Sequence, residues 1–335
     1  GSSNTALGNS ALYDNTSGSS NVAVGESSLE NNTTASYNTA VGYQASYAGT
    51  TAQQNNALGY EALRHTTTAS YNNAFGVQAL RLNTTGANNT AMGQAALYNN
   101  TTASNNTAVG YQAGYSNTTG TQNTAIGQNA LQTNTTNSYS TAVGAQALYS
   151  NTGARNTAVG QNALLNNSTG FGNTAVAQAA LASNTTASNN TAVGYNSATG
   201  NTTGEYNSSF GASSLGTNST GLRNTAIGVN SLLSNTTGSY NVGLGMQALS
   251  SNTTAGYNTS VGYQAGYSNT TSQLNTFLGY HSGYNNTTGL GYNTFVGHSS
   301  GFHITTGAKN TILGAYNGNQ GGLDIRTSSN NIVLS

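Results

Sequence analysis

The six carboxylates of this 335-residue chain are the side chains best suited to acid–base chemistry. A pair that cleaves glycosidic bonds needs its two carboxyl groups about 5–10 Å apart. Glu26 and Glu30 are close in sequence and Glu61 lies a little further along, so a carbohydrate-cleaving site between chains would use these three. Solvated charges in turns explain them more simply, and we expect no catalytic residue and no enzymatic activity. The full set is Asp14, Glu26, Glu30, Glu61, Glu205 and Asp324.

Histidine is the other residue type that could do chemistry here, as a metal ligand. The chain has four, His65, His281, His298 and His303, and it has no cysteine, which excludes thiolate metal sites. One histidine repeated around the axis of a trimer could hold a metal ion. Strand alternation predicts, however, that His281 and His298 point to opposite faces. We therefore expect surface histidines, with no metal and no cofactor.

Threonine recurs in rows, and a flat lattice of hydroxyl groups could bind ice. Thr107 and its equivalents form one row, and Thr118 and Thr119 with their equivalents form another. Two adjacent threonines on an extended strand point in different directions, which argues against a flat lattice in the second row. Ice binding remains an alternative prediction.

Composition excludes several classes of protein. Charged residues make up 4% of the chain and the net charge is zero, so the basic clusters of a nucleic-acid-binding protein are missing. No stretch approaches the ~20 apolar residues of a membrane-spanning helix, and we expect no membrane insertion. The first residues lack the pattern of a signal peptide, and the chain lacks an initiator Met, so we expect a processed or excised piece of a longer protein.

A 17-residue repeat organises the whole sequence, and such repeats indicate a solenoid. Asn106-Thr107-Ala108-Val109-Gly110 is a typical copy, and the first Asn defines position zero. The step between copies is 17 residues except for 16 into residue 156 and 18 into residue 293. Nineteen copies begin at residues 4, 21, 38, 55, 72, 89, 106, 123, 140, 156, 173, 190, 207, 224, 241, 258, 275, 293 and 310.

Each repeat predicts one coil of an all-β parallel solenoid. Gly, Asn and Thr form helices poorly, whereas short strands separated by turns fit the pattern. We expect one strand over residues 106–109 and a second over residues 111–114. The Asn117-Thr118-Thr119-Gly120 segment has the residue types of a turn. Many coils are needed because one coil cannot bury its apolar residues alone.

Positions three and eight of the repeat predict the core, as two facing apolar ladders. Where position eight is Ser or Gly, an aromatic residue usually follows, as in Gly114-Tyr115 and Gly266-Tyr267. We expect these rings to cover the space of the missing Leu, although a surface site that tolerates Tyr would give the same pattern. The predicted core includes Val41, Val109, Ile126, Leu131, Leu148, Val193 and Leu249.

The opposite face of the strand is predicted to meet a second chain. Positions two and four are small in nearly every copy, like Ala108 and Gly110, and such a face suits close approach of a neighbour. Position two becomes large near the C-terminus, at Phe277, Phe295 and Ile312. These three would clamp partner chains or, alternatively, cap the solenoid. We favour three chains around an axis.

The repeat resembles two kinds of protein. Ala108-Val109-Gly110 is similar to the end of the Asn-Ser-Val-Ala-Ile-Gly motif of trimeric autotransporter adhesin heads, which are left-handed parallel β-rolls wound as trimers. The segment from Asn123 to Leu131 is closer to repeat regions of phage and prophage tail fibres. In those fibres the repeats precede a self-cleaving endosialidase-type chaperone domain, and residues 310–334 resemble the segment that joins the two.

These patterns together predict a structural protein. We expect a solenoid over residues 1–314 and a capping or connecting segment over residues 315–335. The resemblance implies a homotrimeric left-handed β-roll that serves as a phage tail fibre or adhesin shaft, at the virion surface or outside the cell. Copies of the chain and host-surface carbohydrate are the expected partners. A filament that assembles end to end is an alternative, because exposed coil ends invite pairing.

Overall fold

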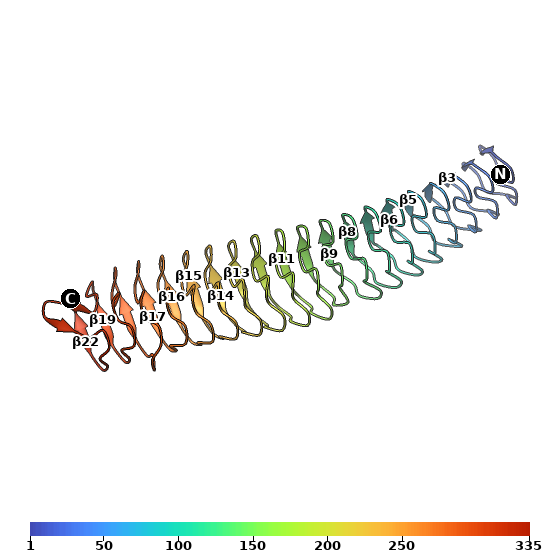
Figure 1. Cartoon of the computed structure of the whole chain (residues 1–335). Coiled ribbons are helices and arrows are strands. Elements are labelled where there is room, and N and C mark those ends of the chain that lie inside the picture. The colour runs from blue at the N-terminus through green and yellow to red at the C-terminus, as the bar shows by residue number, and fades with distance from the viewer. The chain divides into compact units, whose positions relative to one another are not determined.

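Each part of the chain folds as a parallel β-solenoid without helices. The computed structural model describes residues 1–335, which group into two compact units, Gly1–Thr169 and Gly170–Ser335. Within each unit one short strand per coil lies beside the strand of the next coil (Figure 1). The structure contains no helix that could span a membrane.

The strands follow the repeat and are three residues long in every coil. In the first unit they are β1 (Thr5–Leu7), β2 (Val22–Val24), β3 (Thr39–Val41), β4 (Asn56–Leu58), β5 (Asn73–Phe75), β6 (Thr90–Met92), β7 (Thr107–Val109), β8 (Thr124–Ile126), β9 (Thr141–Val143) and β10 (Thr157–Val159). In the second unit they are β11 (Thr174–Val176), β12 (Thr191–Val193), β13 (Ser208–Phe210), β14 (Thr225–Ile227), β15 (Val242–Leu244), β16 (Thr259–Val261), β17 (Thr276–Leu278), β18 (Thr294–Val296), β19 (Thr311–Leu313) and β22 (Ile332–Leu334).

Strands pair in parallel and in the register that the repeat predicts. Thr107 lies beside Thr124, Ala108 beside Ala125 and Val109 beside Ile126. The two irregular steps do not disturb this register, because Thr141 still pairs with Thr157 and Thr276 with Thr294. The extra or missing residue is therefore absorbed in the turns.

The predicted second strand, residues 111–114, is wrong: this part of the coil is a run of tight turns. Gln112 and Gly114 both adopt left-handed backbone angles, with φ of 52° and 61°. The turns still link neighbouring coils, since the Gln112 N–H donates to the Gln94 carbonyl of the preceding coil (3.0 Å) and the Gly114 N–H to the Ala130 carbonyl of the following one (2.9 Å). Alternating left-handed residues thus replace a strand without leaving the backbone unpaired.

The strand faces are the reverse of those predicted. Ala108 is fully buried, whereas Ile126, at the predicted core position, is 38% exposed. Strand alternation sends position two inward and positions one and three outward. Of the predicted core, Leu131, Leu148 and Leu249 are buried as expected, but Val41, Val109, Ile126 and Val193 lie on the outer face of the sheet.

The predicted contacts with a second chain are corrected for the same reason. Ala108, Phe277, Phe295 and Ile312 are fully buried inside their own chain and cannot meet a neighbour. Gly110 does face a close contact, but with the next coil: a Cβ there would lie 2.7 Å from the backbone of Gly127. Small residues at these positions therefore serve the packing of coil on coil.

Two ladders of buried asparagine fill the rest of the interior. The Asn123 N–H donates to Oδ1 of Asn106 (2.9 Å), and Nδ2 of Asn106 donates to the Gly120 carbonyl (2.9 Å). In the second ladder, Nδ2 of Asn117 donates both to Oδ1 of Asn100 (3.0 Å) and to the same Gly120 carbonyl (2.9 Å). The side-chain amides of Asn106 and Asn117 thus bond both within their own coil and to a neighbouring coil, which satisfies polar groups that would otherwise be costly to bury.

The segment after residue 314 joins the second unit. The antiparallel hairpin of β20 (Asn319–Gln320) and β21 (Leu323–Asp324) precedes β22, which pairs in parallel with β19. Position two is large in these last coils, and its rings form a continuous apolar cluster with residues of the segment. The cluster comprises Ala265, Phe277, Phe295, Ile304, Ile312, Tyr316 and Ile325, with Val333 packed against it.

Candidate functional site

The outer face of each sheet carries two parallel rows of side chains, and one of them is an extended row of exposed apolar residues. Position one contributes mostly threonine and position three an aliphatic or aromatic residue. Leu58 is 46% exposed and Met92 45%. The exposed members of the position-three row are Leu7, Leu58, Phe75, Met92, Ile126 and Val159 in the first unit and Phe210, Ile227, Leu244, Leu278 and Leu313 in the second.

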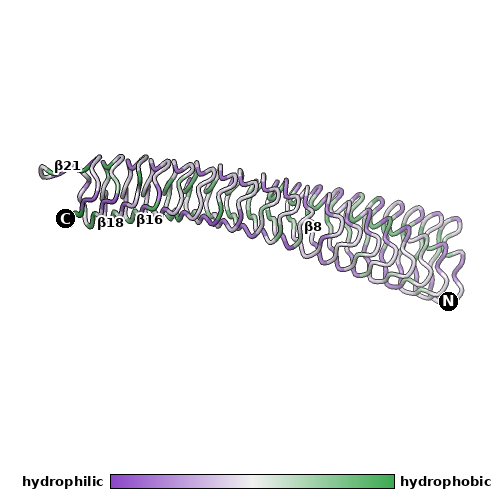
Figure 2. The backbone as a smooth tube through the Cα atoms, turned by 90° about the horizontal axis from the view of Figure 1, so that it is seen from below, coloured by the Kyte–Doolittle hydropathy of each residue, from purple (hydrophilic) through white to green (hydrophobic).

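A third row, at position five, widens this apolar surface beyond the bend at the glycine of position four. Its exposed members are Tyr43, Tyr60, Val77 and Tyr111 in the first unit and Tyr195, Val229, Met246, Tyr263 and Tyr280 in the second. Figure 2 shows hydrophobic segments that recur from coil to coil within each unit. A repeated exposed apolar surface of this kind is typical of an interaction surface.

The hydroxyl group of the first threonine in each turn pair is engaged within the chain. Oγ1 of Thr101 donates to the Thr118 carbonyl (3.1 Å), and Oγ1 of Thr118 donates to the Thr135 carbonyl (3.0 Å). The same bond recurs at Thr236 and Thr253 in the second unit. These hydroxyls therefore hold successive turns together, while the threonines of position one remain on the outer face of the sheet.

The first unit contains the only cluster of three charged side chains joined by ion pairs. Glu61, at position six, accepts from Nε of Arg81 at 2.7 Å and lies 3.5 Å from Nη1 of Arg64. Gln78 donates to the same carboxylate at 3.0 Å, and Nη1 of Arg81 donates to the Tyr98 hydroxyl at 2.8 Å. Glu61 thus pairs with two arginines, whereas Glu26 and Glu30 take no part in an ion pair.

Electrostatics within this cluster favour the charged form of Glu61. Burial alone would raise the pKa of Glu61, but hydrogen bonds from Gln78 and Arg81 and the charges of both arginines outweigh it and lower the pKa. The pKa of the adjacent His65 is lowered by burial first and then by Arg64 and Arg81. The cluster therefore holds two positive charges, one negative charge and a histidine that resists protonation.

Arginine and aromatic side chains continue the cluster along position nine. Arg64 lies over the Tyr47 ring at 6.0 Å and Arg81 over the Tyr98 ring at 5.6 Å. Tyr98 stacks in turn on Tyr115, with ring centroids 5.3 Å apart. Planar groups one coil apart can stack in this way because the coil spacing is that of neighbouring strands, about 4.8 Å.

A second aromatic cluster lies in the second unit and contains two of the histidines. Tyr280 stacks on His298 at 5.0 Å and contacts His281 at 3.9 Å. The predicted opposite orientation of these histidines is wrong, because both rings lie against Tyr280. Nε2 of His281 bonds Oε1 of Gln264 at 2.7 Å, and no group of three or more His, Cys, Asp and Glu side chains could hold a metal ion.

The rings that follow a small position-eight residue do not replace the missing leucine. Tyr284, after Gly283, lies in a surface row, where it stacks on Tyr267 and Phe302. The space beside Gly283 is filled instead by Phe277 of the same coil, whose ring would lie 2.5 Å from a Cβ at Gly283. A large residue at position two therefore compensates for a small one at position eight.

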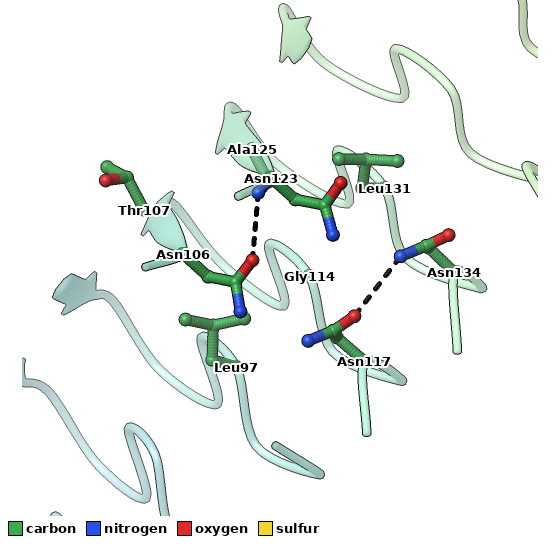
Figure 3. Close-up of a pocket in the computed structure, with 9 residues that line it drawn as sticks. All are labelled: Leu97, Asn106, Thr107, Gly114, Asn117, Asn123, Ala125, Leu131 and Asn134. Carbon is green, nitrogen blue, oxygen red and sulfur yellow. Dashed lines mark hydrogen bonds between the residues drawn. The ribbon is translucent and has the colours of Figure 1, made fainter. Parts of the chain in front are cut away.

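The coil with the smallest residues at both positions contains a small cavity. Ala108 and Gly114 are both small, and a cavity of about 10 Å³ opens between Leu97 and Leu131 (Figure 3). That volume accommodates about one water molecule. Its lining consists of Leu97, Asn106, Thr107, Gly114, Asn117, Asn123, Ala125, Leu131 and Asn134.

No protein-family model matches the chain, and no curated protein matches it either. The two features of the structure that indicate a function are the outer sheet face and the Arg64–Arg81 cluster. Glu61 was a candidate from the sequence, but the two arginines that pair with it were not recognised. A comparison of position six with position nine in consecutive repeats would have predicted that the three side chains lie close together.

Proposed function

We propose that this protein is the shaft of an extracellular fibre, in which copies of the chain associate through the outer faces of their sheets. The observation that carries the proposal is the row of exposed apolar side chains at position three, repeated in coil after coil of each unit. Leaving such a surface in water forgoes about 25 cal/mol for each Å² that association would bury. A second copy of the chain presents the same row of apolar side chains with the same coil-to-coil spacing, so the two rows can pack against each other.

Three chains around a common axis are our preferred arrangement. The threonines of position one and the apolar residues of position three would then lie at the interface, in place of the Ala and Gly face predicted from the sequence. The near absence of charge, 4% of residues, suits this arrangement, since few ions would lose their hydration on association.

The role we propose for the fibre is mechanical. Backbone hydrogen bonds and asparagine ladders between successive coils support a rigid element that holds a binding tip away from a particle or cell. The resemblance of the repeat to phage tail fibres and to adhesin heads supports a location at a virion surface or outside the cell. Host-surface carbohydrate is the partner we propose, and the chemistry of such a fibre requires no catalytic residue.

A charge on the outer face tests the association. Ile126→Glu would place a carboxylate in the apolar interface, at a cost of several kcal/mol per interface if it stays ionised. We expect light scattering to give three times the 33.8 kDa mass of one chain for the native protein and a smaller species for Ile126→Glu. Thr119→Glu, in an exposed turn, is the matched control and should leave the mass unchanged.

A 33.8 kDa monomer in the native protein at micromolar concentration would contradict the proposal. So would equal masses for Ile126→Glu and the native protein. Far-UV circular dichroism of both variants would show whether the coils remain folded, so that loss of association is distinguished from loss of the fold.

Ice binding is a second candidate, supported by the threonines of the outer face. Thr90, Thr107, Thr124 and Thr141 lie in register on four consecutive strands. The row is interrupted by Asn56 and Asn73, and the neighbouring row is bulky and varied. Thermal hysteresis of a concentrated solution decides between the candidates, because a fibre shaft has no reason to lower the freezing point beyond its colligative effect.

A further inference from the structure

The Arg64–Arg81 cluster holds more positive charge and more hydrogen-bond donors than its own fold uses. Arg81 is well engaged, through Nε to Glu61 and Nη1 to the Tyr98 hydroxyl. Arg64 is not: its one ion pair is long, at 3.5 Å, and its buried Nε has no hydrogen-bond partner. A guanidinium has five donors, so most of the capacity of Arg64 is unspent.

The cluster also has more positive than negative charge. Two guanidinium groups on consecutive coils share one carboxylate, in a chain that has only six basic residues in all. Glu61 supplies one negative charge to both arginines, with Oε2 at 2.7 Å from Arg81 and Oε1 at 3.5 Å from Arg64. The three side chains together therefore carry one net positive charge, and a quarter of the Arg64 side chain is exposed to solvent. An anion that approaches Arg64 would therefore meet a guanidinium that is only weakly paired with Glu61.

The surroundings of this guanidinium suit a carboxylate carried by a sugar. A planar guanidinium matches a carboxylate with two parallel hydrogen bonds. Arg64 lies over the Tyr47 ring and Arg81 over the Tyr98 ring. The tyrosine hydroxyls and the Gln78 amide are groups that can bond sugar hydroxyls. A phosphorylated peptide would instead favour a larger basic surface, which this chain lacks.

We propose that Arg64, supported by Arg81, Tyr47 and Tyr98, binds the carboxylate of an acidic saccharide such as a uronic or sialic acid. The proposal rests on the carbohydrate partner of the proposed fibre and names its chemical class and its site. Glu61 acts as an internal competitor that occupies the site when no ligand is present. Removing Glu61 should therefore strengthen binding, which a purely structural ion pair would not do.

The experiment is a titration of the full chain with glucuronic acid and with N-acetylneuraminic acid, followed by ligand-observed NMR. Glucose and N-acetylglucosamine are the neutral arms, and inorganic sulfate is the arm without a sugar. Hydrogen bonds to a charged group contribute about 1.5–3 kcal/mol, so Arg64→Gln should weaken binding of the acidic sugar about tenfold or more. Glu61→Gln should strengthen it, by about fivefold on the scale of a single competing charge.

Arg223→Gln is the matched control. Arg223 also lies between two tyrosine rings, Tyr206 and Tyr240, at 5.6 and 5.4 Å, but has no second arginine beside it. Its substitution should leave binding unchanged. Acidic sugars that bind no better than the neutral ones, or that bind Arg64→Gln as well as the native protein, would overturn the proposal.

Two further outcomes are decisive. In the first, sulfate displaces the bound acidic sugar at the same concentration at which the acidic sugars bind. That result would show an anion site without saccharide recognition and would also overturn the proposal. If Glu61→Gln fails to fold, as judged by circular dichroism, the comparison of Arg64→Gln with Arg223→Gln still decides. Light scattering on the same samples separates this result from the proposed fibre, because loss of sugar binding with the mass unchanged would refute the site alone.

Discussion

At the residue scale, Gly110 shows why one position of the repeat admits almost no side chain. Its φ is +131°, outside the range that side-chain-bearing residues readily adopt, and a Cβ would lie 2.7 Å from the backbone of Gly127. Both restrictions come from the bend that turns the strand into the next segment. Ala177, with φ of 102°, shows that another coil tolerates one methyl group there.

Gly110→Val should therefore destabilise the first unit by more than the ~1 kcal/mol of a Gly entropy effect, because backbone atoms of the next coil would have to move. Chemical denaturation followed by circular dichroism measures the change. Gly322→Val is the control, since Gly322 also has a positive φ, 84°, but nothing lies within 4 Å of a Cβ there. Equal effects of the two substitutions would show that strain at φ, and not crowding between coils, makes glycine necessary.

At the element scale, positions two and eight share a fixed volume inside each coil. An Ala with a Leu fills it in most coils, and a Phe with a Gly fills it at Phe277 and Gly283 and again at Phe295 and Gly301. The coil of Ala108 and Gly114 fills it least, and the cavity lies there. The interior is narrow because buried asparagines occupy the remainder, so a large side chain at one of the two positions leaves room only for a small one at the other.

This exchange of volume predicts opposite effects for the same substitution in two coils. Gly114→Leu should raise the free energy of unfolding by about 1–2 kcal/mol, because it restores the leucine row and needs only the Leu97 methyl group to turn aside. Gly283→Leu should lower it by about 1–3 kcal/mol, since the Phe277 ring already occupies the space. Both glycines have φ near +60°, as the leucines of position eight do near +50°, so the backbone contributes little to the difference. Stabilisation of both variants, or of neither, would contradict the shared volume.

Some features of the coil could be predicted from the sequence, and others depend on how the interior is filled. Strand positions and register follow from the period, since Asn106 and Asn123 begin equivalent strands wherever the faces point. The inward face does not follow, because strand alternation allows either Ala108 or Val109 to point inward. The inward face could have been recognised from the sequence because a large residue at position two, Phe277, occurs with a small one at position eight, Gly283. This pairing indicates that positions two and eight face the same interior. The Arg64–Arg81 site was missed because its carboxylate lies at position six and its arginines at position nine, in two consecutive repeats.

At the scale of the whole molecule, the scarcity of ionisable groups means that few residues control how stability depends on pH. Within the charged cluster of the first unit, burial and the charges of Arg64 and Arg81 lower the pKa of His65, against the opposing effect of Glu61. In the second unit, burial and then the neighbouring His298 lower the pKa of His281. Each of these histidines binds a proton less readily in the folded chain than in the unfolded one.

Stability should therefore fall as the pH is lowered through the unfolded-state histidine pKa of 6.5 and should level off below the lower, folded-state values. The sign follows because the unfolded state takes up the protons that the folded state refuses. We expect the midpoint of thermal unfolding to drop between about pH 7.5 and about pH 5, and the variant with both His65→Gln and His281→Gln to lose most of that drop. Glu61, whose pKa is lowered, should make its own contribution only at more acidic pH, below its unfolded value of 4.5. A midpoint that stays constant through pH 6.5 in the native protein would mean that neither histidine is held neutral by the fold.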